Sequence, residues 1–298
     1  MIGNCQATGV AQALSALLPE ARVEAVPVAT LRQEFGDMDR LVRRLAGCEH
    51  VFSHFFPEGF LPGGNAHALM DRVPRMRLFP TVVFPAFHPD LVYVGDLRSL
   101  RRSSLVASPI GSSHSAIALC AHLEGLDLAA TLALYTEAVF KRLGYYDLWG
   151  EGTEFLLRTA RDVEFDLSAD LARWTRRGCF MHVINHPKLH VLGDLARRLA
   201  REAGCAPLDL RVEDYLADAL LEEEVWPVHG AIAERYGVPA SEAYRGKSRP
   251  GAAPVLFDRG RFVAESFALY ARRPPEELVC ARVSAWRANP DIRAVFSG

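Results

Sequence analysis

One cysteine near the start of the chain has the surroundings of a reactive thiol. It is Cys5, in the segment Gly3-Asn4-Cys5-Gln6, and apolar residues at helical spacing predict a helix over residues 6–18 directly after it. The N–H groups and positive dipole at the start of a helix stabilise thiolate, the nucleophilic form of cysteine. Asn4 and Gln6 could donate hydrogen bonds to an oxyanion formed beside the sulfur. We therefore predict a thiol nucleophile; the alternative is a small buried cysteine that only packs.

Histidine is the side chain that would hold a thiolate and move protons near neutral pH. Four of the ten histidines follow predicted strands or open predicted helices, and these are His54, His88, His114 and His186. Loops at the carboxyl ends of parallel strands converge on one crevice, so we expect at least one of His54, His88 and His114 to contact Cys5. The alternative for each is an ordinary hydrogen-bonded loop histidine.

Other binding signatures are weaker. The loop at residues 111–115, Gly-Ser-Ser-His-Ser, offers several backbone N–H groups to an anion at the start of a helix. Neither G-x-G-x-x-G nor G-x-x-x-x-G-K-[ST] occurs, so the standard nucleotide fingerprints are absent. His182, His186 and His190 have helical spacing, but Pro187 breaks such a helix, and we expect no metal site. The pairs Arg101-Arg102 and Arg197-Arg198 are more typical of a solvated face than of phosphate clamps.

The elements that must position these residues indicate an α/β fold. Up to about residue 110, short strands at residues 22–28, 50–55, 75–84 and 91–94 alternate with helices, which predicts a parallel sheet. Residues 111–298 read as mainly helical, with a strand-like island at residues 179–184, and pack around that sheet in a single domain of residues 1–298. Only Met1 and Ile2 precede Gly3, so the first strand is either very short or begins upstream of this chain.

Composition narrows the class of protein. Half of the 298 residues are hydrophobic, which predicts a globular chain. The formal charge of −2 predicts no long-range electrostatic attraction to nucleic acid or to an anionic membrane. The six cysteines form no CxxC pair, which favours reduced thiols in a cytoplasm. The N-terminus lacks a secretory signal, and charges interrupt the most apolar stretch, residues 115–140. We expect a cytoplasmic protein without a transmembrane segment; its oligomeric state stays open.

Taken together, these motifs resemble those of the WcbI-type polysaccharide biosynthesis proteins, a family of coenzyme-A-dependent acetyltransferases acting on capsule sugars. The resemblance covers most of residues 1–235, with the motifs in the family's order. The motifs are Gly3-Asn4-Cys5-Gln6, Phe87-His88-Pro89-Asp90-Leu91-Val92-Tyr93, His114-Ser115, Gly144-Tyr145-Tyr146-Asp147 and Asn185-His186-Pro187.

The resemblance implies a site and a donor. Cys5 is then the reactive centre, His88 and His114 are its catalytic partners, and three polar neighbours orient these groups or stabilise an oxyanion: Asn4, Gln6 and Ser115. Coenzyme A, as acetyl-CoA, would be the acyl donor, a saccharide the acceptor, and no metal would be involved. Six residues are expected to bind the donor: Gly3, Ser53, His54, Ser113, Asn185 and His186.

Three functions remain open from the sequence. The first is CoA-dependent O-acyl transfer to a saccharide, through an acyl-thiol intermediate or by direct attack of a hydroxyl that histidine deprotonates. The second is a thiol-dependent hydrolase or esterase that uses the same residues with water as acceptor. The third is a non-catalytic module that binds a sugar or nucleotide, in which Cys5 only packs.

Overall fold

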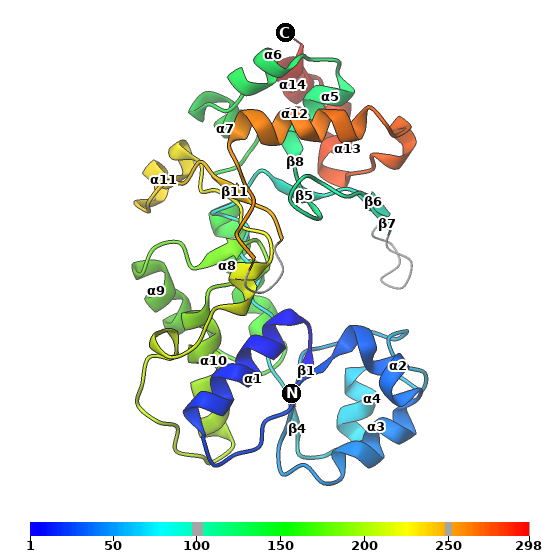
Figure 1. Cartoon of the computed structure of the whole chain (residues 1–298), viewed down its shortest axis with the longest axis vertical. Helices are drawn as coiled ribbons and strands as arrows, with labels where there is room; N and C mark the ends of the chain where they lie inside the picture. The colour runs from blue at the N-terminus through cyan, green and yellow to red at the C-terminus, as the bar shows by residue number, and fades with distance from the viewer. Residues whose placement is uncertain (97–103, 248–251, 298) are drawn as a thin grey trace. The chain divides into compact units, whose positions relative to one another are not determined.

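The structure is a computed structural model that describes residues 1–96, 104–247 and 252–297 (Figure 1). Contacts between residues divide the chain into two compact units, each made of several segments. Unit 1 contains Met1–Val83, Glu154–Phe180 and Asn185–Leu220, and unit 2 contains Phe84–Thr153, Met181–Ile184 and Leu221–Gly298. Arg101 and Arg102 lie outside the described residues. That residues 1–298 behave as a single domain stays a prediction.

Unit 1 is built on a parallel sheet of four strands in the order β2-β1-β3-β4, which confirms the α/β class. The strands are β1 (Ile2–Gly3), β2 (Val26–Pro27), β3 (Val51–Ser53) and β4 (Met76–Leu78). Strand β1 has two residues here and pairs on both sides, with Ile2 opposite Val26 of β2 and Ser53 of β3. The chain goes from β1 to β2 on one side and then crosses to β3 on the other, so the strand order reverses beside β1.

Helices cover both faces of this sheet (Figure 1). On one side lie α1 (Cys5–Leu17) and α10 (Leu189–Glu202); on the other lie α2 (Leu31–Phe35), α3 (Met38–Leu45) and α4 (Ala66–Arg72). Helices α1 and α10 approach closely at Gly9, where an added Cβ would lie 2.5 Å from a methyl group of Leu192. Burial of apolar side chains drives this assembly.

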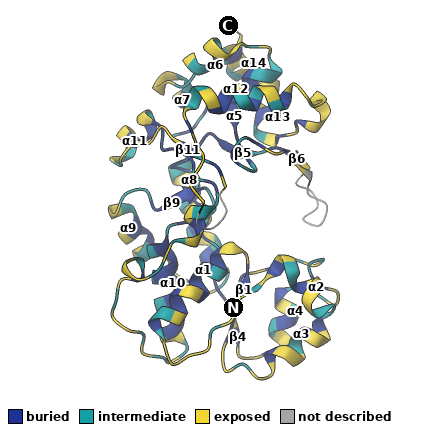
Figure 2. Ribbon diagram, in the orientation of Figure 1, coloured by how far each residue is buried: buried dark blue, intermediate teal, exposed yellow. Residues whose placement is uncertain are grey.

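Each helix presents its apolar stripe to the core (Figure 2). On α3 the stripe is Met38, Leu41 and Leu45, which join one apolar cluster with Ile2 and Val51 of the sheet. Asp37 begins α3 by accepting a hydrogen bond from the N–H of Arg40. Two further helices are α8 (Leu148–Arg161) and α9 (Ser168–Arg176), which the sequence analysis did not predict.

Unit 2 is mainly helical and carries short antiparallel strand pairs. The pairs are β5 (Leu91–Tyr93) with β8 (Ser113–Ser115), β6 (Gly95–Asp96) with β7 (Ser104–Leu105), and β11 (Tyr244–Arg245) with β12 (Leu256–Phe257). The predicted strand at residues 91–94 therefore exists but pairs with β8 rather than joining the parallel sheet. The predicted island at residues 179–184 contains β9 (Met181–Val183), and β10 is His186–Pro187.

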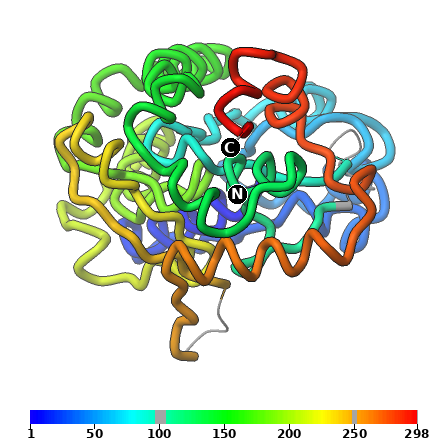
Figure 3. The backbone as a smooth tube through the Cα atoms, turned by 90° about the horizontal axis from the view of Figure 1, so that it is seen from above, coloured from blue at the N-terminus to red at the C-terminus, as the bar shows by residue number. Residues whose placement is uncertain are grey.

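The helices of unit 2 surround the core formed by Trp226, Tyr244 and Phe262. They are α5 (Ala116–Leu123), α6 (Leu128–Ala133), α7 (Glu137–Arg142), α11 (Gly230–Tyr236), α12 (Arg259–Tyr270), α13 (Ala281–Ala288) and α14 (Pro290–Arg293). Figure 3 shows the C-terminal segment in red, and it is tied to α5 because Arg287 and Arg293 both bind Glu124. No helix among the described residues has the length and hydropathy needed to cross a membrane.

Apolar spacing predicts single helices over residues 128–143 and 212–224, but both are interrupted by side chains that bind backbone N–H groups. Residues 128–143 form two helices, because Thr136 caps the N-terminus of α7 by accepting from the N–H of Val139. Residues 212–224 contain only the 3₁₀ turns η2 (Val212–Asp214) and η3 (Ala219–Glu222), since the carboxylate of Asp218 accepts from the N–H groups of Leu189 and Leu220. Such side-chain acceptors compete with regular helix formation.

Candidate active site

Cys5 lies where an open α/β sheet places its ligands. It is the first residue of α1 and directly follows β1 at the carboxyl edge of the sheet, beside the point where the strand order reverses. Its side chain is exposed, whereas Cys120 and Cys280 are buried and the other three cysteines are half-buried. Cys5 therefore combines access to solvent with the start of a 13-residue helix.

Asn4 holds the start of this helix. Its side-chain oxygen accepts a hydrogen bond from the N–H of Gln6 at 2.9 Å, and its carbonyl oxygen accepts from the N–H of Ala7 at 3.0 Å. Asn4 is thus the N-cap residue of α1. Because its amide oxygen is engaged in the cap, the turn that carries Cys5 is held in a defined conformation.

His54 is brought beside this turn by β3. The backbone N–H of Asn4 donates to His54 Nδ1 at 3.4 Å, which assigns the ring proton to Nε2. Burial lowers the pKa of His54 to about 3, so the ring is neutral at physiological pH. His54 Nε2 is buried and has no hydrogen-bond partner among the described residues. The site therefore contains a neutral imidazole whose N–H donor is unused.

Gly3 allows His54 to approach the first strand this closely. A Cβ added at Gly3 would lie 2.5 Å from His54 Nδ1 and 2.7 Å from the Cβ of Ala7, closer than side chains tolerate. On its other side, the His54 ring packs against Phe79 in a tilted arrangement, with the ring centroids 4.1 Å apart. The imidazole is therefore fixed between a glycine and an aromatic ring.

Gln6 fixes the start of α1 to two loops far away in the sequence. Its Nε2 donates to the carbonyl oxygens of Val82 and Asn185 at 2.9 and 2.8 Å, and its Oε1 accepts from the N–H of Val82 at 2.9 Å. The side chain is fully buried. Both amide hydrogens are thus engaged with carbonyl groups, which gives Gln6 an orienting role next to Cys5.

The remaining predicted residues of unit 1 lie on the same segments. Ser53 ends β3, and its buried hydroxyl donates to the carbonyl oxygen of His54. Asn185 contributes the carbonyl that Gln6 binds, and His186 follows it in β10. Gly3, Asn4, Gln6, Ser53, His54 and Asn185 are therefore connected to one another around the start of α1.

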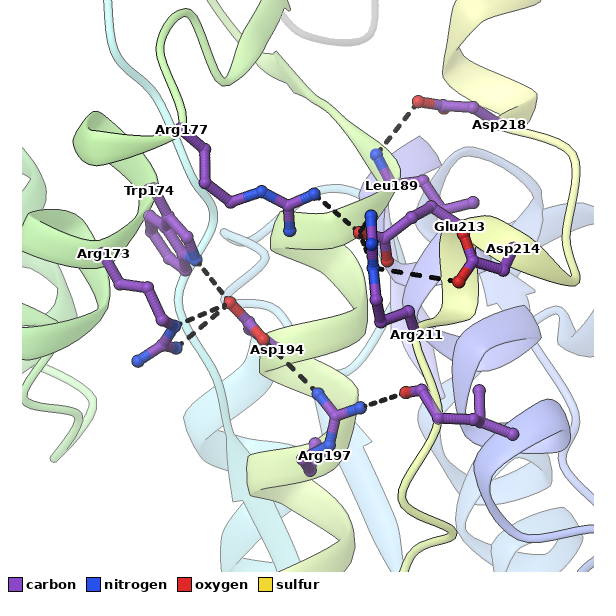
Figure 4. A network of polar contacts seen from close by, with 11 residues as sticks. Arg173, Trp174, Arg177, Leu189, Asp194, Arg197, Arg211, Glu213, Asp214 and Asp218 are labelled. Carbon is purple, nitrogen blue, oxygen red and sulfur yellow. Dashed lines mark hydrogen bonds and ion pairs between the residues drawn. The ribbon is translucent and has the colours of Figure 1, made fainter.

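The arginine pair at residues 197 and 198 belongs to a network of ion pairs in unit 1 (Figure 4). Asp194 on α10 accepts from Arg173, Arg197 and the indole of Trp174. Arg198 pairs with Glu202 one turn later. The charges of Arg197 and Arg198 are therefore matched by carboxylates within unit 1.

His88 and His114 lie in unit 2, each in a fully buried setting. The ring nitrogens of His88 face the carbonyl oxygens of Pro227 and Met181 at 3.3 and 3.4 Å. His114 Nε2 donates to the carbonyl oxygen of Val106, and its Nδ1 is 2.8 Å from the hydroxyl of Tyr270. Burial lowers the pKa of His114. Both rings are thus integrated into the core of unit 2.

The predicted anion-binding loop is occupied by a carboxylate of the protein itself. Glu224 accepts hydrogen bonds from the N–H groups of Ser112 and Ser113 and from the Ser112 hydroxyl. Gly111 has φ of +145°, and a Cβ there would lie 2.0 Å from Glu224 Oε1. The glycine is required for both conformation and space. Sequence inspection does not reveal Glu224, because it is 111 residues away from Ser113.

Asp90 stands in the motif of residues 87–93 but was not among the predicted site residues, and it receives contacts from two other motifs of unit 2, through Ser115 and Tyr145. Ser115 caps α5, accepting from the N–H of Ala118, and its hydroxyl is 2.7 Å from that of Tyr135. Asp90 accepts from the hydroxyl of Tyr145 and the N–H of Ile117. Burial raises the pKa of Asp90 to about 6, although Ser115, Ile117, Tyr145 and Arg282 act in the opposite direction.

The fold and site define an α/β protein with an exposed cysteine at the switch point of a parallel sheet. A family model described as the polysaccharide biosynthesis enzyme WcbI matches residues 1–208, more than half of the chain. The chain therefore belongs to the WcbI family of polysaccharide biosynthesis enzymes, which confirms the resemblance.

A solved structure extends the likeness of fold to nearly the whole chain. It has a TM-score of 0.68, is 16% identical, and the match covers 99% of this chain and 96% of that one. It is described as WcbI, a novel polysaccharide biosynthesis enzyme, in a native form without a disulfide bond between coenzyme A and one of its cysteines. No curated protein matches the chain.

Proposed function

We propose that this protein is a coenzyme-A-dependent O-acyltransferase that acetylates a saccharide hydroxyl in capsule or surface polysaccharide biosynthesis. The observation that carries the proposal is an exposed Cys5 at the start of α1, next to Asn4, whose backbone N–H donates to the neutral His54 after β3. The mention of coenzyme A and a cysteine for the similar solved structure supports a donor that is itself a thiol ester. We further propose that the protein is cytoplasmic, where acetyl-CoA is made.

The reaction moves an acetyl group from sulfur to oxygen. By the covalent route, the Cys5 thiolate attacks the thioester carbonyl, the acetyl–S bond to coenzyme A breaks, and coenzyme A leaves as its thiolate. The saccharide hydroxyl then attacks the acetyl-cysteine, Cys5 leaves as thiolate, and the hydroxyl proton passes to the released thiolate of coenzyme A. By the direct route, the hydroxyl attacks acetyl-CoA and its proton ends on coenzyme A. The start of α1 favours thiolate at Cys5 in the first route.

We assign His54 the role of a hydrogen-bond donor rather than a base. With a pKa of about 3, the imidazole stays neutral through the reaction, and its Nε2–H can stabilise the oxyanion of a tetrahedral intermediate. A buried neutral histidine that polarises a carbonyl is a known catalytic device. Asn4 supports this role, because its N–H keeps the proton on Nε2. His88 and His114 enter the test as the other partners that the sequence put forward.

Binding and transfer are measured separately. Coenzyme A at 100 times its Kd should stabilise the wild type by about 2.7 kcal/mol in a thermal-shift experiment. Transfer from radiolabelled acetyl-CoA to a pool of neutral saccharides should be lost in Cys5→Ala and reduced roughly 100-fold or more in His54→Phe. Cys48→Ser, which changes a half-buried cysteine away from the site, is the matched control.

The outcomes separate the candidate functions. Loss of transfer in Cys5→Ala with retained binding of coenzyme A supports the proposal. Release of acetate at the same rate with and without saccharide would instead identify a hydrolase. Full transfer activity in Cys5→Ala would overturn the role of the thiol, and greater losses in His88→Ala or His114→Ala than in His54→Phe would reassign its partner.

A further inference from the structure

Unit 2 buries several polar atoms that lack a hydrogen-bond partner. Four of them lie close together: Asp90 Oδ2, His229 Nε2, Tyr244 Oη and Arg259 Nε have no partner with hydrogen-bond geometry within the described ranges. The side chains of Asp90, His229 and Tyr244 are at most 1% exposed. Buried polar groups are almost always hydrogen-bonded, so such a cluster calls for partners beyond the described side chains, which a ligand or ordered water would supply.

Contacts join these residues into one cluster. Starting from Asp90, Ser115 lies in the adjacent strand and contacts the hydroxyl of Tyr135 at 2.7 Å. The guanidinium of Arg259 lies 4.8 Å above the ring of Tyr135 and 3.5 Å from His229 Nδ1. The His229 ring is 6.2 Å from that of Tyr244. We call these six residues, Asp90, Ser115, Tyr135, His229, Tyr244 and Arg259, the Asp90 cluster.

The unpaired atoms require both a donor and an acceptor. Arginine can only donate, so His229 Nδ1 accepts from Arg259 and the ring proton sits on Nε2, which is a donor. Arg259 Nε is a second donor, Asp90 Oδ2 is an acceptor, and the Tyr244 hydroxyl can act as either. A ligand hydroxyl group, which donates and accepts at once, satisfies such a set.

Charge in the cluster argues against an ionic ligand. Arg259 already pairs with Glu242, which balances its positive charge. His229 is neutral, because burial and then Arg259 lower its pKa to about 3. Burial disfavours the ionised form of the Asp90 carboxyl group and raises its pKa to about 6. A bound anion would be repelled by the ionised carboxylate of Asp90, and a bound cation would be repelled by the guanidinium of Arg259.

The cluster reaches the surface on one side. Tyr135 and Arg259 are half-buried, and Glu242, which binds Arg259, is exposed. The stacked pair Arg259–Tyr135 therefore lies between solvent and the buried polar atoms. Aromatic rings of Tyr135, Tyr244 and Phe140 surround His229, and such rings pack well against the apolar faces of sugars.

We propose that the Asp90 cluster binds the hydroxyl groups of a neutral saccharide, through Asp90, His229, Tyr244 and Arg259. The hydroxyl chemistry follows from the cluster itself, whereas the choice of a saccharide as the molecule that carries the hydroxyl groups rests on the proposed function. The sequence alone does not reveal this cluster, because only Asp90 and Ser115 of its six residues stand in the motifs quoted above.

The experiment measures saccharide binding and coenzyme A binding independently. A panel of neutral mono- and disaccharides is titrated by saturation-transfer NMR against wild type, Tyr244→Phe and Asp90→Asn. We expect at least tenfold weaker saccharide binding in both variants and unchanged affinity for coenzyme A. The Tyr244 hydroxyl has no partner with hydrogen-bond geometry among the described residues, so Tyr244→Phe should leave the melting temperature nearly unchanged. Tyr215→Phe, at a 70% exposed tyrosine, is the matched control.

Two results would overturn the proposal. One is wild-type protein that binds coenzyme A but no saccharide of the panel, which would leave ordered water as the partner of the cluster. The other is saccharide affinity in Tyr244→Phe and Asp90→Asn equal to that of the wild type. If Asp90→Asn fails to fold, Tyr244→Phe alone decides. Saccharide binding that persists in Cys5→Ala, together with absence of any acyl transfer in the wild type, would reject the proposed function while supporting this site.

Discussion

Replacing Gln6 by methionine should loosen the segment that carries Cys5. Methionine fills a similar volume but cannot replace the three hydrogen bonds of the buried amide to Val82 and Asn185. An unsatisfied buried polar group destabilises a protein by about 1–3 kcal/mol. The substitution leaves three such groups, the carbonyl and N–H of Val82 and the carbonyl of Asn185, and the last is partly open to water. We therefore expect the free energy of unfolding to fall by about 3–5 kcal/mol. This is a large share of the ~5–15 kcal/mol that stabilises a typical domain.

Urea unfolding followed by tryptophan fluorescence measures this change at pH 7. Gln33→Met, on the exposed side of α2, is the matched control and should stay within about 0.5 kcal/mol of the wild type. The melting temperature of Gln6→Met should fall by roughly 6–20 °C. Stability of Gln6→Met within about 0.5 kcal/mol of the wild type would refute the assignment of Gln6 as the residue that fixes α1 to its neighbouring loops.

A second substitution at the same position tests the direction of the hydrogen bonds. Gln6→Glu keeps the acceptor for the N–H of Val82 but places a carboxylate against the carbonyl oxygens of Val82 and Asn185. Burial and these oxygens would raise the pKa of the new carboxyl above its unfolded value. The Gln6→Glu protein should therefore be most stable when the new carboxyl is protonated. Its free energy of unfolding should decline, relative to that of Gln6→Met, as the pH rises through the folded-state pKa of this carboxyl. Parallel pH curves for the two variants would contradict this orientation.

Four further predictions follow from the same contacts. Iodoacetamide should label Cys5 below pH 8 and before the other five cysteines, least of all Cys120, whose pKa burial raises to about 12; labelling of Cys5 only after unfolding would exclude it as a nucleophile. Gly3→Ala should destabilise the protein by roughly 1–3 kcal/mol and slow acyl transfer, since its Cβ would displace His54; unchanged values in both assays would contradict that packing. Because burial lowers the pKa of His54 to about 3, its contribution to stability is present above about pH 6.5 and is lost as the pH falls toward 3, so His54→Phe should flatten the acid limb of the unfolding curve. The raised pKa of Asp90, about 6, works in the opposite sense: Asp90→Asn should gain up to about 3 kcal/mol relative to wild type between pH 4 and 7, and a constant difference would disprove it.

Several local features of unit 1 could be predicted from the sequence, although α8 and α9 were missed. Apolar spacing predicted α1 to within one residue at each end, and short runs rich in apolar, β-branched and aromatic residues predicted β3 and β4, although the strands are shorter than expected. The position of Cys5 at a helix start and of His54 after a strand followed from the same patterns. These predictions succeed because the signal for a helix or a buried strand lies within a few adjacent residues.

Features that depend on distant partners were beyond the sequence. Gln6 binds a carbonyl 179 residues away, and Glu224 fills a loop 111 residues before it. From the sequence alone, a glutamine or glutamate is predicted to lie on the surface, since both types are mostly exposed in proteins. Only the folded structure shows which distant group it binds. The break between α6 and α7 was missed for a related reason: Thr136 can continue a helix or cap one, and its hydrogen bond to Val139 decides.

Hydrogen bonding explains why the histidines differ in what they can do, and why the sequence could not rank them. His114 has both ring nitrogens engaged, with Tyr270 and Val106, so little capacity for chemistry is left. His54 and His229 each bind through Nδ1 and keep a buried Nε2 without a partner in the described parts of the chain. An unused buried donor destabilises the fold unless a substrate or water satisfies it. The acyl-transfer and saccharide-binding proposals therefore rest on His54 and His229, which each keep such a donor.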